Sequence, residues 1–452
     1  MRQKWWLDIV GILGVLTAVL LFGWWALPRA VVAMPSRVRL HLPEELLQWV
    51  STPLPTALPA PKTAVAILPL PTISLPTTAL PPTNTTVLTL TYAPISAGGT
   101  PVLSEAEVAV PTPTLAPSAI PTSVPTPLPA QAYIEGLQII PQKFNNCGPA
   151  NLTINLNHYG AAAEQLDIAA QIRPTYDDRN VSPHELAAYV NNETPLQAAV
   201  FSGGNLTMLK RLLANGFPVV IEKGLLPNDW QGWMGHYLTL IGYDDTAQEF
   251  IALDTFLGPW DSSGLHESYD FIEEHWQHFN YTFYVVYPPE QETALMAVLG
   301  PEMTDPQQMW LHAVRLAQTE VDKNHNNAFA WFNLGTSLTH LAQLTDNTTY
   351  YGHAAAAYDQ ARTIGLPWRM LWYQFQPYAA YLATGRVDDV LTLAEATLSS
   401  SGGDYLEESF YYRGLAYAIL GDNGRAQSNL QKAIALNPTY TAAAAALEQL
   451  EP

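Results

Sequence analysis

A single cysteine stands at the start of a predicted helix, where a thiol could act as a nucleophile. Cys147 is the only cysteine of the 452-residue chain. Residues 146–159 predict a helix, because Asn145 or Asn146 can cap it and Pro149 suits its first turn. The partial positive charge of a helix N-terminus favours a thiolate. A lone cysteine is more often a small buried hydrophobe, so its role depends on its neighbours.

Two further residues could serve this thiol as a base and as the group that orients the base. His236 opens a predicted strand, and Asp254 closes the strand that returns after a turn at 244–248. If Tyr243 and Glu249 pair across that turn, His236 and Asp254 are diagonal neighbours on one face of the sheet. Their backbones would then lie about 7–8 Å apart, within side-chain reach.

A side-chain amide upstream of the cysteine completes the set of candidate groups. Gln142 stands five residues before Cys147. Its amide could donate to an oxyanion together with the N–H of Cys147, and Gly148 leaves room for a substrate carbonyl to approach. The candidate catalytic residues are therefore Cys147, His236, Asp254 and Gln142, and their combination favours catalysis over a structural cysteine.

The same residues lie in three segments that together form a recognisable pattern. The segments are Gln142-Lys-Phe-Asn-Asn-Cys147-Gly-Pro-Ala, Gly235-His236-Tyr237 running into Ile241-Gly242-Tyr243-Asp244, and Leu253-Asp254. This pattern resembles the bacteriocin-processing-peptidase-like family of the papain-like clan, over residues 133–289. The resemblance implies that Cys147 is the nucleophile, His236 the base, Asp254 the orienting residue and Gln142 the oxyanion donor. One departure is Asp254-Thr255, where the family often has Asp-Pro.

Peptide-bond hydrolysis through a thioester acyl-enzyme is the expected reaction of such a site, on a peptide or protein substrate. Two alternatives remain at this point. The same residues could transfer the acyl group to an amine or deamidate glutamine, since these reactions differ only in the nucleophile that reaches the thioester. The domain could also be a catalytically silent module that binds peptides.

Other polar residues of this region predict structure rather than chemistry. Asp244-Asp245 is typical of a turn, and His275 and His278 have no third ligand near them in the sequence, which favours the surface. We therefore expect no metal and no cofactor. Trp230 and Trp233, just before His236, could line a substrate cleft or pack within the folded domain.

The elements around these residues predict an α+β domain over 131–290. A second helix is predicted at 205–215, with leucines on one face and Gly216 at its end. Residues 218–221 predict a short buried strand, and 281–287 a last aromatic and β-branched strand.

Residues 305–452 are predicted to be entirely helical and resemble a tetratricopeptide-repeat solenoid. The small and large residues of its last repeat follow the 34-residue pattern of that motif, at Phe410, Gly414, Tyr417, Gly421, Ala426, Leu430, Ala433 and Pro438. A second repeat also matches the pattern, with extra residues between its two helices. Its matching positions are Trp331, Leu334, Gly335, Leu338, Ala354, Tyr358, Ala361 and Pro367. Residues 370–400 resemble a degenerate third, with Tyr381, Gly385 and Ala394 in register. The alternative is an unrelated helical bundle. Stacked repeats would offer a surface for a protein partner.

The N-terminal region, residues 1–50, contains an apolar run at 9–27 that is long enough to span a bilayer. Tryptophans flank the run as interfacial residues do, and a signal peptide cleaved near Val31-Val32-Ala33 is the alternative. We expect an uncleaved transmembrane helix, with the catalytic and repeat domains outside the cytoplasm at the cell membrane. The arginines after the run do not favour this orientation, but long downstream domains can cross regardless.

Residues 51–130 are rich in proline and threonine and predict a disordered spacer of polyproline II character. About 80 residues at about 3.1 Å each could reach on the order of 250 Å when extended. The formal net charge of the whole chain is −20. A chain without a basic surface cannot neutralise phosphates, which argues against nucleic acid as a partner.

Overall fold

The computed structural model describes residues 127–228 and 231–450, together with residues 17, 26–27, 30–31 and 57–62 of the N-terminal part. The predicted membrane span at 9–27 falls almost entirely outside the described residues, and so does most of the predicted spacer. Within the part that is described, no helix is both long and apolar enough to cross a bilayer.

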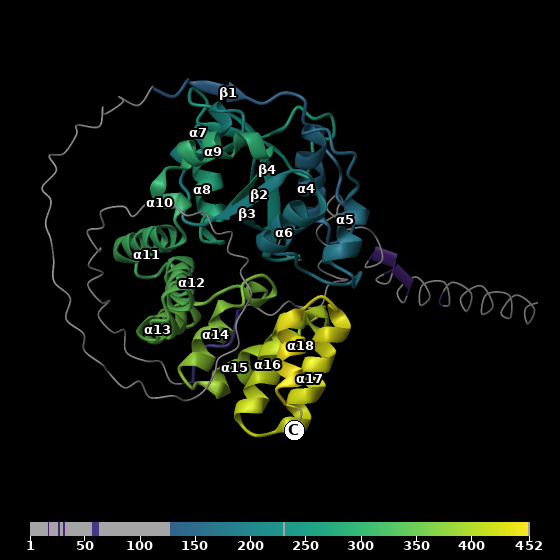
Figure 1. Cartoon of the computed structure of the whole chain (residues 1–452), viewed down its shortest axis with the longest axis vertical. Helices are drawn as coiled ribbons and strands as arrows, with labels where there is room; N and C mark the ends of the chain where they lie inside the picture. The colour runs from purple at the N-terminus through teal and green to yellow at the C-terminus, as the bar shows by residue number, and fades with distance from the viewer. Residues whose placement is uncertain are drawn as a thin grey trace, which may run out of the picture.

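Seven antiparallel strands form one sheet, with the order β2-β7-β3-β4-β5-β6 and β1 added to β4 (Figure 1). The strands are β1 (Gln131–Tyr133), β2 (Gln197–Phe201), β3 (Val219–Leu225), β4 (Met234–Asp244), β5 (Glu249–Leu253), β6 (Leu265–Ser268) and β7 (Phe283–Tyr287).

Helices cover both faces of this sheet (Figure 1). They are α4 (Cys147–His158), α5 (Gln165–Ile172), α6 (Pro183–Glu193), α7 (Leu206–Ala214), α8 (Tyr269–Gln277) and α9 (Glu292–Leu299). Alternate residues of the strands enter two separate apolar cores, because successive side chains of a strand point to opposite faces. Val220 and Tyr284 pack with α4 and α6, whereas Ile221 and Val285 pack with α7, α8 and α9. The predicted α+β architecture is therefore confirmed for this domain.

A β-bulge in β4 sets the register of the strands that carry His236 and Asp254. The turn begins one residue later than predicted, since Asp244 rather than Tyr243 lies opposite Glu249. The bulge between Leu240 and Gly242 then takes up one residue, so that Thr239 lies opposite Leu253. Beyond the bulge the register is the predicted one.

Helix α4 is buried on almost every side from Gly148 to Leu156, not only on the single face that its leucines predict. Ile154 packs in a further small core under the chain that leads into the helix. The polar residues of the helix are buried too, and their side chains make hydrogen bonds, as when Asn155 Nδ2 donates to Thr239 Oγ1 at 3.2 Å; Asn155 Oδ1 has no partner among the described residues. The segment that precedes α4 covers the outer face of the helix, as the packing of Leu137 with Ile154 shows. The spacing of the leucines in the sequence does not predict this cover.

Strand β3 extends past the predicted end at Ile221 to Leu225 and buries two charged residues. The ammonium group of Lys223 lies 4.9 Å from the ring centre of Phe271 in α8, which supplies cation–π stabilisation. Burial raises the pKa of Glu222 well above its ordinary value, and the charge of Cys147 raises it further. A neutral glutamic acid and a cation on an aromatic face are tolerated in a core, which is why the strand continues there.

The remaining helices follow the sheet and lie below it in Figure 1. They are α10 (Pro301–Thr304), α11 (Pro306–Lys323), α12 (Ala328–Thr345), α13 (Thr349–Ile364), α14 (Gln376–Ala383), α15 (Val387–Leu398), α16 (Glu407–Ile419), α17 (Asn423–Leu436) and α18 (Thr441–Glu448), with short 3₁₀ turns at Pro289–Gln291, Met370–Trp372 and Gly403–Tyr405. Helical structure thus begins before the predicted boundary at 305. Leu295 and Leu299 of α9 belong to the core of the sheet domain.

Small residues let these helices approach one another in pairs. A Cβ at Gly335 in α12 would lie 2.7 Å from the ring of Tyr358 in α13, and one at Gly414 in α16 would lie 2.9 Å from Leu430 in α17. Both glycines occupy the small positions of the repeat pattern. The assignment to tetratricopeptide repeats stays a prediction.

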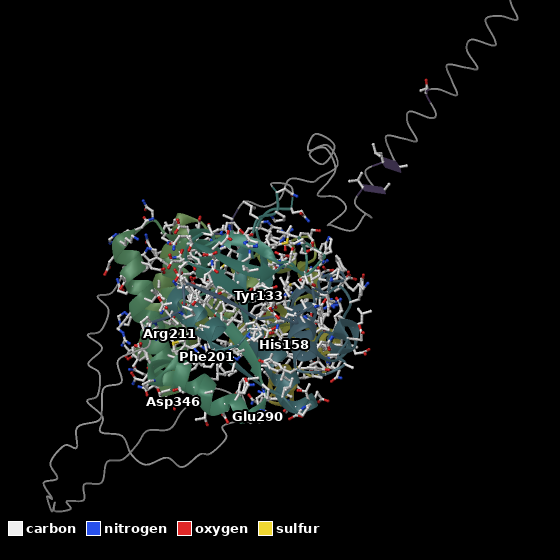
Figure 2. All side chains as sticks on the ribbon, turned by 90° about the horizontal axis from the view of Figure 1, so that it is seen from above. Tyr133, His158, Phe201, Arg211, Glu290 and Asp346 are labelled. Carbon is white, nitrogen blue, oxygen red and sulfur yellow. The ribbon has the colours of Figure 1, made fainter. Side chains whose placement is uncertain are left out.

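The helical part, which we define as residues 305–450, packs against the sheet domain. Seen from above, much of it lies behind the sheet domain (Figure 2). The contacts include buried hydrogen bonds. Asn280 Nδ2 donates to Ser337 Oγ at 3.0 Å, and Gln374 Nε2 donates to the carbonyl oxygen of His278 at 2.9 Å. Arg369 donates to the carbonyl oxygens of Gln231 and Trp233.

Candidate active site

The imidazole of His236 and the carboxylate of Asp254 are hydrogen-bonded in the interior. Nε2 of His236 lies 3.0 Å from Oδ1 of Asp254, and the two side chains are only 3% and 1% exposed. Oδ1 also accepts the backbone N–H groups of Phe256 and Leu257, each at 2.8 Å. The turn after β5 therefore holds the carboxylate in a fixed orientation. The diagonal pairing predicted from the hairpin brings these two residues together.

Electrostatics favour the protonated form of His236. Burial disfavours an imidazolium ion, but the charge and hydrogen bond of Asp254 outweigh it, with a further contribution from a hydrogen bond and the charge of Cys147. Together they raise the pKa of His236 to about 9. Burial would raise the pKa of Asp254, yet the neighbouring imidazolium lowers it below its ordinary value. The pair is thus an ion pair at neutral pH.

Cys147 is the first residue of α4 and is partly exposed. The predicted asparagine cap is wrong, because the Asn146 side chain donates to Gln165 and no side chain of the described residues caps α4. The N–H groups of the first turn are therefore left to face a substrate oxyanion beside the thiol. Gly148 lies so close to Tyr237 that a Cβ there would be 3.3 Å from its ring.

Gln142 is held by Thr255, the residue at which the chain departs from the family pattern. The Thr255 hydroxyl donates to Oε1 of Gln142 at 2.8 Å, and the backbone N–H of Gln142 donates to the carbonyl oxygen of Thr255 at 2.9 Å. Asn151 Nδ2 in turn donates to Thr255 Oγ1 at 3.3 Å. Since Oε1 is engaged, the Nε2 group of Gln142 is oriented as the donor. A proline at this position could not make the side-chain bond.

A tyrosine from the helical part stands beside these groups, and the sequence offered no signal for it. Tyr373 follows the 3₁₀ turn at Met370–Trp372, and its ring lies 2.9 Å from where a Cβ on Gly235 would be. Burial raises the pKa of Tyr373 to about 12; the charge of Arg369 opposes this rise, and the charge of Cys147 adds to it. Tyr373 therefore lies beside Gly235, the residue before His236 in β4, and within reach of the charge of Cys147, although it comes from residues predicted to have no part in the chemistry.

An aromatic cluster flanks the cysteine on the side of the loop between α5 and α6. Phe144 and Tyr176 stack with their ring centres 5.4 Å apart, and they are 42% and 68% exposed. The Arg179 guanidinium lies 5.4 Å from the Phe144 ring and 5.8 Å from the ring of Trp372. Phe144 precedes Cys147 by three residues, so this exposed cluster lies close to the candidate nucleophile in the chain.

The other singled-out residues have structural roles. Asp244-Asp245 forms the predicted turn, with Asp244 Oδ1 accepting the N–H of Thr246 at 2.7 Å. Trp233 packs between the sheet domain and the helical part, stacked on Phe279 at 5.7 Å between ring centres. Trp230 lies outside the described residues.

The two histidines near the end of α8 bind no common ligand. His278 is not a surface residue as predicted, because its Nδ1 accepts the Trp233 indole N–H at 3.1 Å and its ring stacks on Phe329. His275 lies 2.9 Å, through Nδ1, from the carbonyl oxygen of Phe271. Among the residues that the structure describes, no group of three His, Cys, Asp or Glu side chains could hold a metal ion.

Comparison with known proteins identifies the sheet domain. Residues 130–284 match the model of the Peptidase_C39 like family. No curated protein matches the chain. Solved structures similar to it include a C39-like peptidase from Bacillus anthracis, 17% identical, which covers 34% of this chain and 96% of its own with a TM-score of 0.29.

Two more solved structures resemble the same part of the chain. Xylellain, a cysteine protease from Xylella fastidiosa, is 13% identical and covers 36% of this chain and 87% of its own, with a TM-score of 0.28. The peptidase domain of Streptococcus ComA, a bi-functional ABC transporter, is 14% identical. The match covers 34% of this chain and 99% of that one, with a TM-score of 0.26. The family match agrees with the resemblance drawn from the motifs: residues 130–284 are similar to the Peptidase_C39 like family, and the sheet domain is a cysteine-type peptidase domain.

Proposed function

We propose that Cys147 is the nucleophile of this peptidase domain, His236 its base, Asp254 the residue that orients the base, and Gln142 the side-chain donor of the oxyanion hole. The observation that carries the assignment is the buried His236–Asp254 ion pair, and the charge of Cys147, the only cysteine of the chain, helps to raise the pKa of His236. A structural cysteine has no need of such a pair.

The reaction begins with the Cys147 thiolate attacking the carbonyl carbon of the scissile peptide bond. The oxyanion that forms accepts hydrogen bonds from the first turn of α4 and from Gln142 Nε2. The imidazolium of His236 then donates its proton to the leaving amine, and a thioester to Cys147 remains. Neutral His236 next takes a proton from water, which attacks the thioester; the acid product leaves, and the thiolate of Cys147 and the imidazolium of His236 are restored.

Substitution of the nucleophile and its base tests this assignment. We expect Cys147→Ala to abolish hydrolysis of a peptide substrate while the fold is retained, and His236→Ala to come close to the same loss. His266→Ala is a matched control, since this histidine is half-exposed at the sheet edge. Unchanged hydrolysis by the purified Cys147→Ala protein would refute the assignment.

The proposal also places the peptidase at the cell membrane, outside the cytoplasm. It is supported by the apolar run at 9–27 and the proline- and threonine-rich residues 51–130. Protease added to intact cells should then release the catalytic domain by cutting within 51–130. Cleavage that occurs only after lysis would place the domain in the cytoplasm instead.

The helical part is proposed to be a tetratricopeptide-type array that recruits a protein partner or substrate and also supports the peptidase domain. The paired helices with glycine–large contacts at Gly335 and Gly414 support the first half of this proposal. The buried contacts of Asn280 and Gln374 across the two parts support the second half.

A further inference from the structure

A short piece of the proline-rich region, residues 57–62, lies against the helical part. The backbone N–H of Leu58 donates to the carbonyl oxygen of Leu366 at 3.0 Å, and Nε of Arg362 donates to the carbonyl oxygen of Pro59 at 2.8 Å. Leu58 is 5% exposed and belongs to the main apolar core of the helices. The prediction of a disordered spacer is therefore wrong for these six residues.

Contacts among the helices orient Arg362, the residue that binds this segment. Arg362 in α13 is only 3% exposed, and its Nη1 donates to Tyr381 Oη in α14 and to Asp389 Oδ1 in α15, each at 2.9 Å. These bonds orient the guanidinium so that Nε faces Pro59. In the described part of the chain, Pro59 provides the acceptor for this buried N–H, which would otherwise lose its partner.

The surface next to the segment is hollow. A cavity of about 610 Å³ begins at Pro59 and Lys62 and continues along α15 and α16. Its lining carries charges of both signs: Glu395 pairs with Arg413 at 3.1 Å, and Asp388 complements the charge of Lys62. There is therefore room for more residues of an extended peptide beyond the docked ones.

We propose that α13, α14 and α15 form a binding site for an extended Leu-Pro peptide, and that Leu58-Pro59 of the same chain occupies it. The leucine side chain fills an apolar socket, and the carbonyl oxygen of the proline accepts from Arg362. Extended proline-rich chain has no internal hydrogen bonds, so its carbonyl groups are open to such recognition. The helical part thus has a ligand within its own chain.

Docking shortens the tether between the membrane and the catalytic body, a consequence that rests on the anchor of the proposed function. Leu58 follows the predicted span by only about 30 residues, which reach about 90 Å when extended, compared with about 250 Å for the whole spacer. Release of Leu58 would extend the tether.

Peptide binding to the full-length chain tests the proposal. The probe is a fluorescein-labelled peptide of residues 55–64, and the control peptide carries aspartate at the position of Leu58. The attached segment competes at an effective concentration on the order of millimolar. We therefore expect the probe to bind the Leu58→Asp chain at least tenfold more tightly than the wild-type chain. The control peptide should bind neither.

Leu80→Asp is the matched control variant, because Ala79-Leu80-Pro81 repeats the Ala-Leu-Pro sequence of the docked segment. It should bind the probe as the wild-type chain does. Equal affinity of the wild-type and Leu58→Asp chains for the probe, including no binding to either, would overturn the proposal. Leu58→Ala replaces Leu58→Asp if the latter does not fold. Peptide hydrolysis, measured on the same samples, reports separately on the proposed catalytic function.

Discussion

Among the single residues, His236 sets the pH range in which the site is charged. Its pKa is raised from 6.5 to about 9, chiefly because Asp254 stabilises the imidazolium against the effect of burial. A folded-state pKa above the unfolded value stabilises the protein fully below about pH 6.5, and this contribution is lost as the pH rises through about 9. Activity that needs the imidazolium should fall over the same alkaline range.

Asp254→Asn removes the charge that raises this pKa but leaves an oxygen that can accept from the imidazole. We expect kcat/KM to fall less than in His236→Ala, and the alkaline limb of its pH profile to move to lower pH. The measurement is kcat/KM against pH for the wild type and the variant. An alkaline limb that stays in place would show that Asp254 does not set the pKa of His236.

Thr255 affects catalysis through Gln142. Thr255→Val keeps the shape of the side chain but removes the hydroxyl that fixes Oε1 of Gln142. We expect kcat to fall about tenfold with KM nearly unchanged, since an oxyanion donor acts mainly in the transition state. Thr255→Ser should restore most of the rate. A Thr255→Val enzyme with normal kcat, or one whose loss lies in KM alone, would contradict this positioning role.

The proximity of His236 and Asp254 could be predicted because it depends on local pattern. The hairpin that joins them follows from strand periodicity and a short turn, and the bulge at Leu240–Gly242 offsets the one-residue difference between the predicted and the observed turn. Thr255 and Tyr373 could not be predicted. Their contacts depend on tertiary packing between segments distant in the sequence.

At the level of the elements, strand β4 and the turn before α14 share a close contact beside the active site. A Cβ at Gly235 would lie 2.8 Å from Phe279 and 2.9 Å from Tyr373. Gly235→Ala should therefore push the Tyr373 segment away from His236. We expect a destabilisation of about 1–3 kcal/mol and a larger KM for a peptide substrate.

Gly352→Ala in α13 is the matched control, since a Cβ there meets nothing within 4 Å. It should leave KM unchanged and the helix slightly stabilised. Thermal melts and peptide kinetics on both variants are the measurements. Equal behaviour of the two variants would mean that the contact between β4 and Tyr373 does not matter to the site.

Element boundaries were predicted well where capping and turn residues are strong, and less well where burial is unusual. Gly216 follows α7 with a positive φ, as expected, and Asn205, where the predicted helix starts, caps it by accepting the N–H of Met208. The end of β3 was missed because Glu222 and Lys223 are charged residues that only a tertiary environment makes tolerable.

For the whole molecule, the question is whether the helical part can be removed without harm to the peptidase. Deleting residues 305–452 would expose Trp233 and remove the partners of Asn280 and the His278 carbonyl oxygen. Each lost hydrogen bond costs about 1 kcal/mol, so the melting temperature should fall by at least about 5 °C. Activity on a short peptide should fall in step with the folded fraction. A truncated protein with an unchanged melting temperature and full activity would favour recruitment alone.

The two-part organisation followed from composition and helical periodicity, whereas the way in which the parts join did not. No pattern in the sequence marks the surfaces that meet around Trp233, because their aromatic residues are equally typical of a substrate cleft. The docked segment at 57–62 was likewise hidden within a region whose composition predicts disorder.

The most direct test of the account is the reactivity of the single thiol toward an electrophilic peptide. Because Cys147 is the only cysteine, covalent labelling followed by mass spectrometry reports on this site alone. We predict that the wild-type protein is labelled at least about 100-fold faster at neutral pH than His236→Ala, since an unassisted thiol is mostly protonated there. Equal labelling rates in the two proteins, at the rate of an ordinary thiol, would contradict the assignment of Cys147 and His236 as a catalytic pair.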